Sequence, residues 1–179
     1  MTTPAPALPV VLVGFMGAGK STVGRLLAGH LGVAFADSDD VITRRAGQTP
    51  REIFAADGEP AFRALEREVV RELVTDGRTG VVALGGGAVE DAGTREVLRQ
   101  AVVVHLDVSF EQVRRRVGGD RGRPVLARPD LPAVFAARQA GYRDAADVVV
   151  ATDGLRPADV AARVLAALAE AGRGPVTPR

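Results

Sequence analysis

Short apolar runs alternate along the chain with longer amphipathic stretches. The runs with the length and β-branched content of buried strands are Val10–Val13, Val33–Ala36, Val81–Leu84, Val102–Leu106 and Val148–Val150. Between them, apolar residues recur at helical spacing. Two such stripes are Val23, Leu26, Leu27 and Leu31, and Phe62, Leu65, Val69 and Leu73. A last helix begins around Pro157 and has the stripe Val160, Val164 and Leu168. Strands that alternate with helices predict an α/β fold, with a parallel sheet covered by helices on both faces.

The two ends and one internal stretch depart from this pattern. Residues 1–9 and 172–179 are rich in proline, alanine or glycine, so we expect flexible tails around a single domain of residues 10–171. The chain of 179 residues suits one domain with a sizeable core. The glycine- and arginine-rich stretch at about residues 117–130 predicts a mobile lid.

Composition narrows the classes of function. Because the chain has no cysteine, disulfides and thiolate metal sites are excluded, and a cytoplasmic location is expected. A net charge of +1, one tyrosine and no tryptophan argue against a nucleic-acid or membrane surface. No signal peptide or apolar run of membrane-spanning length is evident. We therefore expect small-molecule ligands and no nucleic-acid or membrane partner. The expected oligomeric state is a monomer.

A phosphate-binding loop follows the first predicted strand. The segment Gly14-Phe15-Met16-Gly17-Ala18-Gly19-Lys20-Ser21 matches G-x-x-x-x-G-K-[ST] in full. Its glycines let backbone N–H groups turn toward an anion, and the following helix adds its positive N-terminal end. The alternative, a chance glycine-rich turn, is opposed by the strand before it and the helix after it. The predicted ATP contacts in this loop are Gly17, Ala18, Gly19, Lys20, Ser21 and Thr22, with Lys20 on the β- and γ-phosphates and the Ser21 hydroxyl on Mg²⁺.

Two carboxylates follow the second predicted strand. Asp37 and Asp39 come where the strand ends, at the ligand edge of an open α/β sheet, and share a face if the strand geometry persists. One of them would then hold Mg²⁺ through water while the other faces an acceptor hydroxyl; together with the resemblance described below, this assigns Asp37 to the metal. The alternative is a structural role in which Ser38 or Asp39 caps a helix over Val41–Ala46.

Further segments resemble the shikimate kinase family. They are Gly47-Gln48-Thr49-Pro50-Arg51-Glu52-Ile53-Phe54, Gly58-Glu59-Pro60-Ala61-Phe62-Arg63-Ala64-Leu65-Glu66, the triplet Gly85-Gly86-Gly87, the lid motif Arg123-Pro124-Val125-Leu126, and an ending with Arg138, Tyr142, Ala146 and Asp147. The resemblance runs from Val10 to about Leu168. It implies a P-loop kinase domain of the nucleoside-monophosphate-kinase type, with a five-stranded parallel sheet. It also implies Mg²⁺-dependent transfer of the ATP γ-phosphate to the 3-hydroxyl of shikimate, in the pathway to chorismate and the aromatic amino acids.

The resemblance also assigns roles to single residues. Arg63 and Arg138 grip the shikimate carboxylate, the residues Gly85, Gly86 and Gly87 lie against its ring, and Asp39 binds its hydroxyls and accepts a proton. The residues assigned to the nucleotide beyond the loop are Arg116, Arg156, Pro157 and the lid residue Arg123, which also acts with Lys20 on the transferring phosphate.

Glu66 lies three positions after Arg63, so on a helix it can pair with the guanidinium and fix its orientation. The alternative is an exposed ion pair of little energetic value.

Three other functions compete with this hypothesis. A gluconate kinase shares the phosphate loop, but the F-R-x-x-E and G-G-G elements argue against it. A GTPase-like switch requires an N-K-x-D motif, which the sequence lacks. A nucleotide-binding protein without chemistry is opposed by the intact Lys20, Ser21, Asp37 and Asp39. The two histidines, His30 and His105, have no ligand spacing and are assigned no chemistry.

Overall fold

A computed structural model describes residues 8–117 and 130–171 of the chain. Its centre is one parallel sheet of five strands in the order β2-β3-β1-β4-β5. The strands are β1 (Val10–Val13), β2 (Ala34–Asp37), β3 (Thr79–Ala83), β4 (Val102–Asp107) and β5 (Val148–Ala151). The predicted α/β fold with a parallel five-stranded sheet is therefore confirmed. Most of the predicted lid, Arg123 included, and the C-terminal tail lie outside the described residues.

The central strand shows why the strands appear in the sequence as continuous apolar runs. All four residues of β1 are buried, since β3 and β4 flank it and helices cover both faces of the sheet. The strand predicted at Val33–Ala36 begins one residue later, because the Val33 N–H still bonds to the Ala28 carbonyl at the end of the preceding helix. Pro9 is the last residue of the predicted N-terminal tail, yet its carbonyl accepts a hydrogen bond of 2.9 Å from Val102 N–H.

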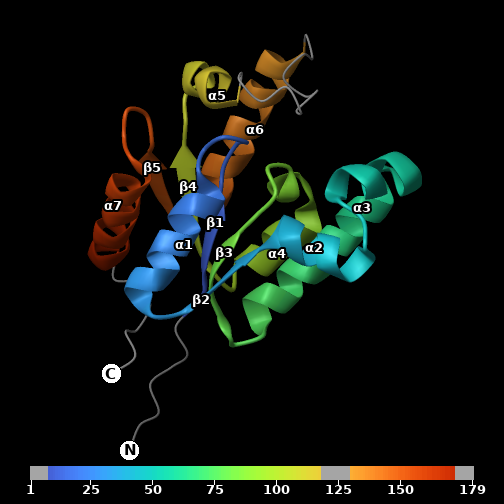
Figure 1. The fold of residues 1–179 in the computed structure, drawn as a ribbon, viewed down its shortest axis with the longest axis horizontal. Coiled ribbons are helices and arrows are strands. Elements are labelled where there is room, and N and C mark those ends of the chain that lie inside the picture. Colours follow the sequence, from blue (N-terminus) through green and yellow to red (C-terminus); the bar gives the residue numbers. More distant parts are fainter. Residues whose placement is uncertain (1–7, 118–129, 172–179) are drawn as a thin grey trace, which may run out of the picture.

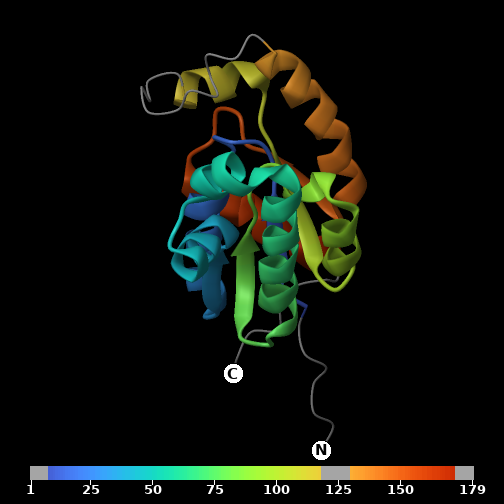
Figure 2. The same cartoon turned by 90° about the vertical axis from the view of Figure 1, so that its right-hand side faces the viewer.

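The helices bury the apolar stripes seen in the sequence. They are α1 (Lys20–Leu31), α2 (Ser38–Ala46), α3 (Pro50–Thr75), α4 (Ala92–Leu98), α5 (Phe110–Val117), α6 (Leu131–Ala145) and α7 (Pro157–Glu170), with a 3₁₀ turn η1 (Ala88–Glu90) before α4. Figure 1 shows α1 packed with α7 to one side of the sheet and α3 with α4 to the other. Figure 2 shows α5 and α6 standing above the sheet. Within the described ranges, no helix is both long and apolar enough to span a membrane.

Helix α3 is broken where the family-like motif contains Gly58. The backbone there has φ 82° and ψ 171°, a conformation that side chains disfavour, and Pro60 opens the second half of the helix. The start of α3 is a capping box: Glu52 N–H donates to Thr49 Oγ1 (3.3 Å), and Thr49 N–H donates to Glu52 Oε2 (2.7 Å). The T-x-x-E and G-E-P parts of the motif thus shape the helix that carries Arg63 and Glu66.

Candidate active site

The phosphate loop connects β1 to α1 and wraps around a lysine. The Lys20 ammonium donates to the carbonyls of Gly14 (2.7 Å) and Phe15 (3.1 Å). A Cβ on Gly14 would lie 2.7 Å from the Leu106 carbonyl oxygen, so only glycine lets the loop pass this close to β4. Because α1 begins at Lys20, the N–H groups of its first turn and its dipole favour an anion at this loop.

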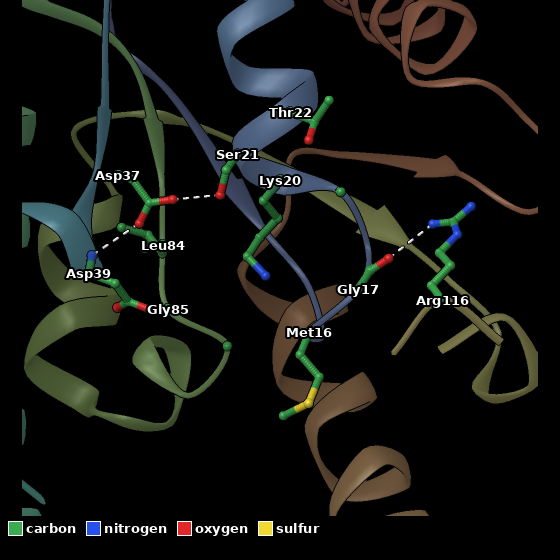
Figure 3. Close-up of a pocket in the computed structure, with 12 residues that line it drawn as sticks. Met16, Gly17, Lys20, Ser21, Thr22, Asp37, Asp39, Leu84, Gly85 and Arg116 are labelled. Atoms are coloured by element: carbon green, nitrogen blue, oxygen red, sulfur yellow. Dashed lines mark hydrogen bonds between the residues drawn. The ribbon is translucent and has the colours of Figure 1, made fainter. Parts of the chain in front are cut away.

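A cavity of about 390 Å³ opens beside this loop. Its lining residues are Met16, Gly17, Gly19, Lys20, Ser21, Thr22, Asp37, Asp39, Leu84, Gly85, Gly86 and Arg116 (Figure 3). We call it the phosphate cavity. In Figure 3 the Lys20 side chain lies between the two aspartates and Arg116. The structure thus brings five of the six predicted loop contacts into one cavity; the sixth, Ala18, lines a smaller one next to it.

The smaller cavity, of about 170 Å³, extends along the other side of the loop. It includes Pro157, together with Arg116, which donates to the carbonyls of Gly17 (3.0 Å) and Thr152 (3.0 Å). Both predicted nucleotide residues therefore lie next to the loop. Arg156 does not: its side chain is 82% exposed and pairs with Asp159 at 2.8 Å.

The two aspartates occupy different elements. Strand β2 ends at Asp37, which is the N-cap of α2: its Oδ1 accepts from Asp39 N–H (3.1 Å) and its Oδ2 accepts from the Ser21 hydroxyl (2.5 Å). The alternative in which Ser38 or Asp39 caps this helix is wrong, because the helix begins at Ser38, three residues before Val41. The strand geometry that would have put Asp37 and Asp39 on one face also ends at Asp37. Asp39 still faces the phosphate cavity, because the first turn of the helix brings it back beside Asp37.

The charge state of Asp39 is set by its surroundings. Burial raises the pKa of its carboxyl above the ordinary value, the neighbouring charge of Asp37 adds to this, and Lys20 and Arg63 oppose it. A carboxylate with a raised pKa is the stronger base, so Asp39 is suited to accept a proton from a hydroxyl.

The Ser21 hydroxyl and the Asp37 carboxylate suit a magnesium ion. Both present oxygen, the ligand type that Mg²⁺ prefers, and they lie 2.5 Å apart beside the phosphate loop. No group of three or more histidine, aspartate or glutamate side chains in the described part of the chain could hold a metal by itself. The donor set fits an ion that takes its remaining ligands from phosphate and water.

A third cavity, of about 530 Å³, adjoins the phosphate cavity. Its lining residues are Met16, Asp39, Pro50, Arg51, Phe54, Ala55, Phe62, Arg63, Glu66, Gly85, Gly86, Gly87 and Arg138, and we call it the acceptor cavity. Four residues line both the phosphate cavity and the acceptor cavity: Met16, Asp39, Gly85 and Gly86. Asp39 therefore stands on the wall that the two cavities share.

Two arginines and a buried carboxylate form the far end of the acceptor cavity. Arg63 Nη1 donates to Glu66 Oε2 at 2.6 Å, and the Glu66 side chain is only 1% exposed. The alternative of an exposed ion pair is therefore wrong. Burial raises the pKa of Glu66, and the Arg63 guanidinium opposes that rise. Arg138, from α6, reaches the same place and donates to Glu90 Oε2 at 2.9 Å.

The glycine triplet makes room for these side chains. A Cβ on Gly85 would lie 2.8 Å from Asp39 Oδ1 and 3.0 Å from Glu66 Oε1, and one on Gly87 would meet the guanidinium of Arg63. Gly85 N–H donates to the buried Ser38 hydroxyl (3.1 Å), and the Tyr142 hydroxyl donates to the Gly86 carbonyl. Side chains at Gly85 or Gly87 would push the acidic and basic groups out of position.

Sequence reasoning missed three parts of this site. Glu90 contacts both cavity arginines, Ser38 fixes the glycine triplet, and Tyr142 was noted only as part of a motif. No local spacing reveals these contacts, whereas the Thr49-x-x-Glu52 capping box has a sequence signature that was overlooked. His30 and His105 line none of these cavities.

Comparisons with known proteins show the family to which the chain belongs. The family model for shikimate kinase matches residues 16–169. A curated shikimate kinase from Mycobacterium avium (strain 104) is 46% identical over 162 residues, which cover 88% of this chain and 92% of that protein. Another, from Thermobifida fusca (strain YX), is 47% identical over 165 residues and covers 90% and 95%. The solved structure of a shikimate kinase from Acinetobacter baumannii in complex with shikimate superposes with a TM-score of 0.84 at 37% identity, covering 92% of this chain and 94% of that one.

Proposed function

The chain belongs to the shikimate kinase family, and on this basis we propose that it phosphorylates the 3-hydroxyl of shikimate with ATP as the phosphate donor. The products are shikimate 3-phosphate and ADP, in the pathway to chorismate and the aromatic amino acids. The observation that carries the residue assignment is the position of Asp39 on the wall between the two cavities, with the phosphate loop on one side and the paired arginines on the other.

The acceptor cavity offers a complementary group to each end of shikimate. Arg63 and Arg138 supply guanidinium forks for the carboxylate, as the bidentate geometry of such pairs favours. The glycine triplet lets the ring approach the backbone closely, and Asp39 receives the hydroxyl end. Glu66 accepts a hydrogen bond from Arg63 Nη1, whereas Arg63 Nη2 points toward Glu90.

The phosphate cavity would hold the triphosphate of ATP. The loop amides and Lys20 bind its β- and γ-phosphates, while Arg116 and Pro157 lie on the nucleotide side of the loop. Arg156 would have to rotate away from Asp159 to reach the nucleotide. Ser21 and Asp37, the latter through water, would hold Mg²⁺, which when bound neutralises charge on the phosphates.

Transfer then requires little covalent chemistry from the protein. Asp39 accepts the hydrogen bond of the 3-hydroxyl and orients the hydroxyl oxygen toward the γ-phosphorus. As the new P–O bond forms and the bond from the γ-phosphorus to ADP breaks, Asp39 takes the hydroxyl proton. Lys20 balances the charge that develops on the phosphate oxygens. Arg123, which resembles the lid arginine of the family, is proposed to contact the transferring phosphate. We also propose a cytoplasmic monomer, which cell fractionation and sedimentation would check.

A panel of acceptors tests the proposed function. Release of ADP is measured with shikimate, gluconate and nucleoside monophosphates, each with and without Mg²⁺, and Lys20→Ala serves as the inactive background. We expect rapid Mg²⁺-dependent ADP release with shikimate alone. Faster turnover of gluconate or of a nucleotide would contradict the assigned acceptor and leave the kinase chemistry intact.

A further inference from the structure

Glu90, on the turn η1, contacts both arginines of the acceptor cavity. Its Oε2 lies 2.9 Å from Arg138 Nη2 and 3.4 Å from Arg63 Nη2. One carboxylate oxygen of the protein thus accepts from the two guanidinium groups that are assigned to the carboxylate of shikimate.

The positive charge of these arginines is already neutralised by carboxylates of the protein. Arg63 and Arg138 contribute two positive charges, and the three carboxylates in ion pairs with them, Glu66, Glu90 and Glu59, contribute three negative charges. Glu59 contacts Arg63 alone, with its Oε1 3.4 Å from Nη2. A substrate carboxylate that enters this cluster finds no excess positive charge, so it must replace one of the carboxylates that the protein supplies.

Of these carboxylates, Glu90 is the one that contacts both arginines and can also leave. The Glu66 side chain is 1% exposed, and removing its charge from Arg63 would strand it in a buried position. The Glu90 side chain is 44% exposed and can rotate into water, where its charge is solvated at small cost. Glu90 also uses the Nη2 atoms of both arginines, whereas Glu66 uses Arg63 Nη1.

We propose that Glu90 is an internal counter-ion of the substrate-carboxylate site, which occupies Arg63 and Arg138 until the carboxylate of shikimate displaces it. This inference rests on the proposed function. Glu90 weakens substrate binding by the free energy of its own two contacts, and it lowers the affinity of the site for shikimate without touching the phosphate that is transferred.

The test compares Glu90→Gln with the wild type. Calorimetry without nucleotide gives the Kd for shikimate, and steady-state kinetics gives KM and kcat. Because the neutral amide competes poorly for two guanidinium groups, we expect Kd and KM to fall about three- to tenfold, the span of one or two partly exposed ion pairs. The change in kcat should be smaller than the change in KM. A Kd that is unchanged or higher would overturn the proposal; a higher value would make Glu90 a residue that holds the arginines in place.

Two further variants separate displacement from a general change of charge. Glu90→Asp keeps the charge but is too short to reach both arginines, so displacement predicts a lowered Kd, whereas a pure field effect predicts the wild-type value. Glu59→Gln removes an equal charge beside Arg63 but has no contact with Arg138 in the described structure, so its Kd should stay within about twofold of the wild type. A wild-type Kd for Glu90→Asp, or an equal gain in Glu59→Gln, would overturn the proposal.

The same measurements distinguish its failure from that of the proposed function. A wild-type protein that neither binds nor phosphorylates shikimate refutes the function and this inference together. A wild-type protein that does both, with no gain in Glu90→Gln, refutes the inference alone.

Discussion

Replacing Asp39 with asparagine removes the group that stands between the two cavities while nearly preserving its shape. If Asp39 accepts the proton of the attacking hydroxyl, kcat should fall by about 10²–10⁴, which corresponds to about 3–5 kcal/mol in the activation barrier. The lower end of this range is expected, because the amide oxygen of asparagine still orients the hydroxyl and because loose phosphoryl transfer needs little help from a base. ATP affinity should persist, since Lys20 and the loop amides are untouched.

The same substitution should stabilise the fold. Burial and the charge of Asp37 raise the pKa of Asp39, so the folded protein holds this proton more tightly than the unfolded chain does. The contribution of Asp39 to stability therefore falls as the pH rises from the pKa of this carboxyl in the unfolded chain through its pKa in the folded protein. At neutral pH the ionised carboxylate disfavours folding. The N-cap of α2 is Asp37 rather than Asp39, so the substitution removes no capping interaction.

Turnover and thermal denaturation are measured on the same preparations at neutral pH. Asp40→Asn is the matched control, since Asp40 lies on the same helical turn, is 61% exposed and faces Arg25 at 4.0 Å. We expect the Asp39 variant to have a lower kcat and a higher melting temperature, and the control to retain normal turnover. Normal turnover in Asp39→Asn, or a lower melting temperature, would refute this description of Asp39.

Three other predictions concern binding, stability and pH. Arg63→Ala and Arg138→Ala should each weaken shikimate binding by about 2–5 kcal/mol in calorimetry while nucleotide binding stays normal; unchanged affinity in both would place the substrate carboxylate elsewhere. Thr49→Ala removes the capping box of α3 and should cost about 1 kcal/mol in the free energy of unfolding by urea, and no loss would mean that the cap is dispensable. Because Asp39 must be ionised to accept a proton, kcat/KM should fall as the pH decreases through its raised pKa, above the ordinary value of 3.8; an acidic limb that survives in Asp39→Asn would belong to another group.

Much of the fold was predictable because its signals are local. Buried parallel strands such as Val10–Val13 read as apolar runs, and the stripe of Val160, Val164 and Leu168 fixes the buried face of α7. The phosphate loop combines a strand, glycines and a helix start in one continuous segment, so its position followed directly. Strand ends were less predictable, because the hydrogen bond of Val33 to Ala28 depends on how α1 terminates.

The site was predictable only where its residues are close in sequence. Arg63 and Glu66 pair at three-residue spacing, although the burial of Glu66 depends on packing that spacing does not encode. Glu90 lies 27 positions from Arg63 and 48 from Arg138, so only the folded chain brings the three together. The alternative cap of α2 was placed at Ser38 or Asp39 rather than at Asp37 because all three are good capping residues, and the contact of Asp37 with Ser21 is tertiary.

The position of the phosphate on the product tests the central claim most directly. Shikimate is converted with ATP and Mg²⁺, and the product is examined by phosphorus and proton NMR. With the carboxylate held at Arg63 and Arg138 and the opposite end at Asp39, we predict a single product phosphorylated at the 3-hydroxyl. A phosphate on another hydroxyl, a mixture of isomers, or no phosphorylated shikimate would contradict it.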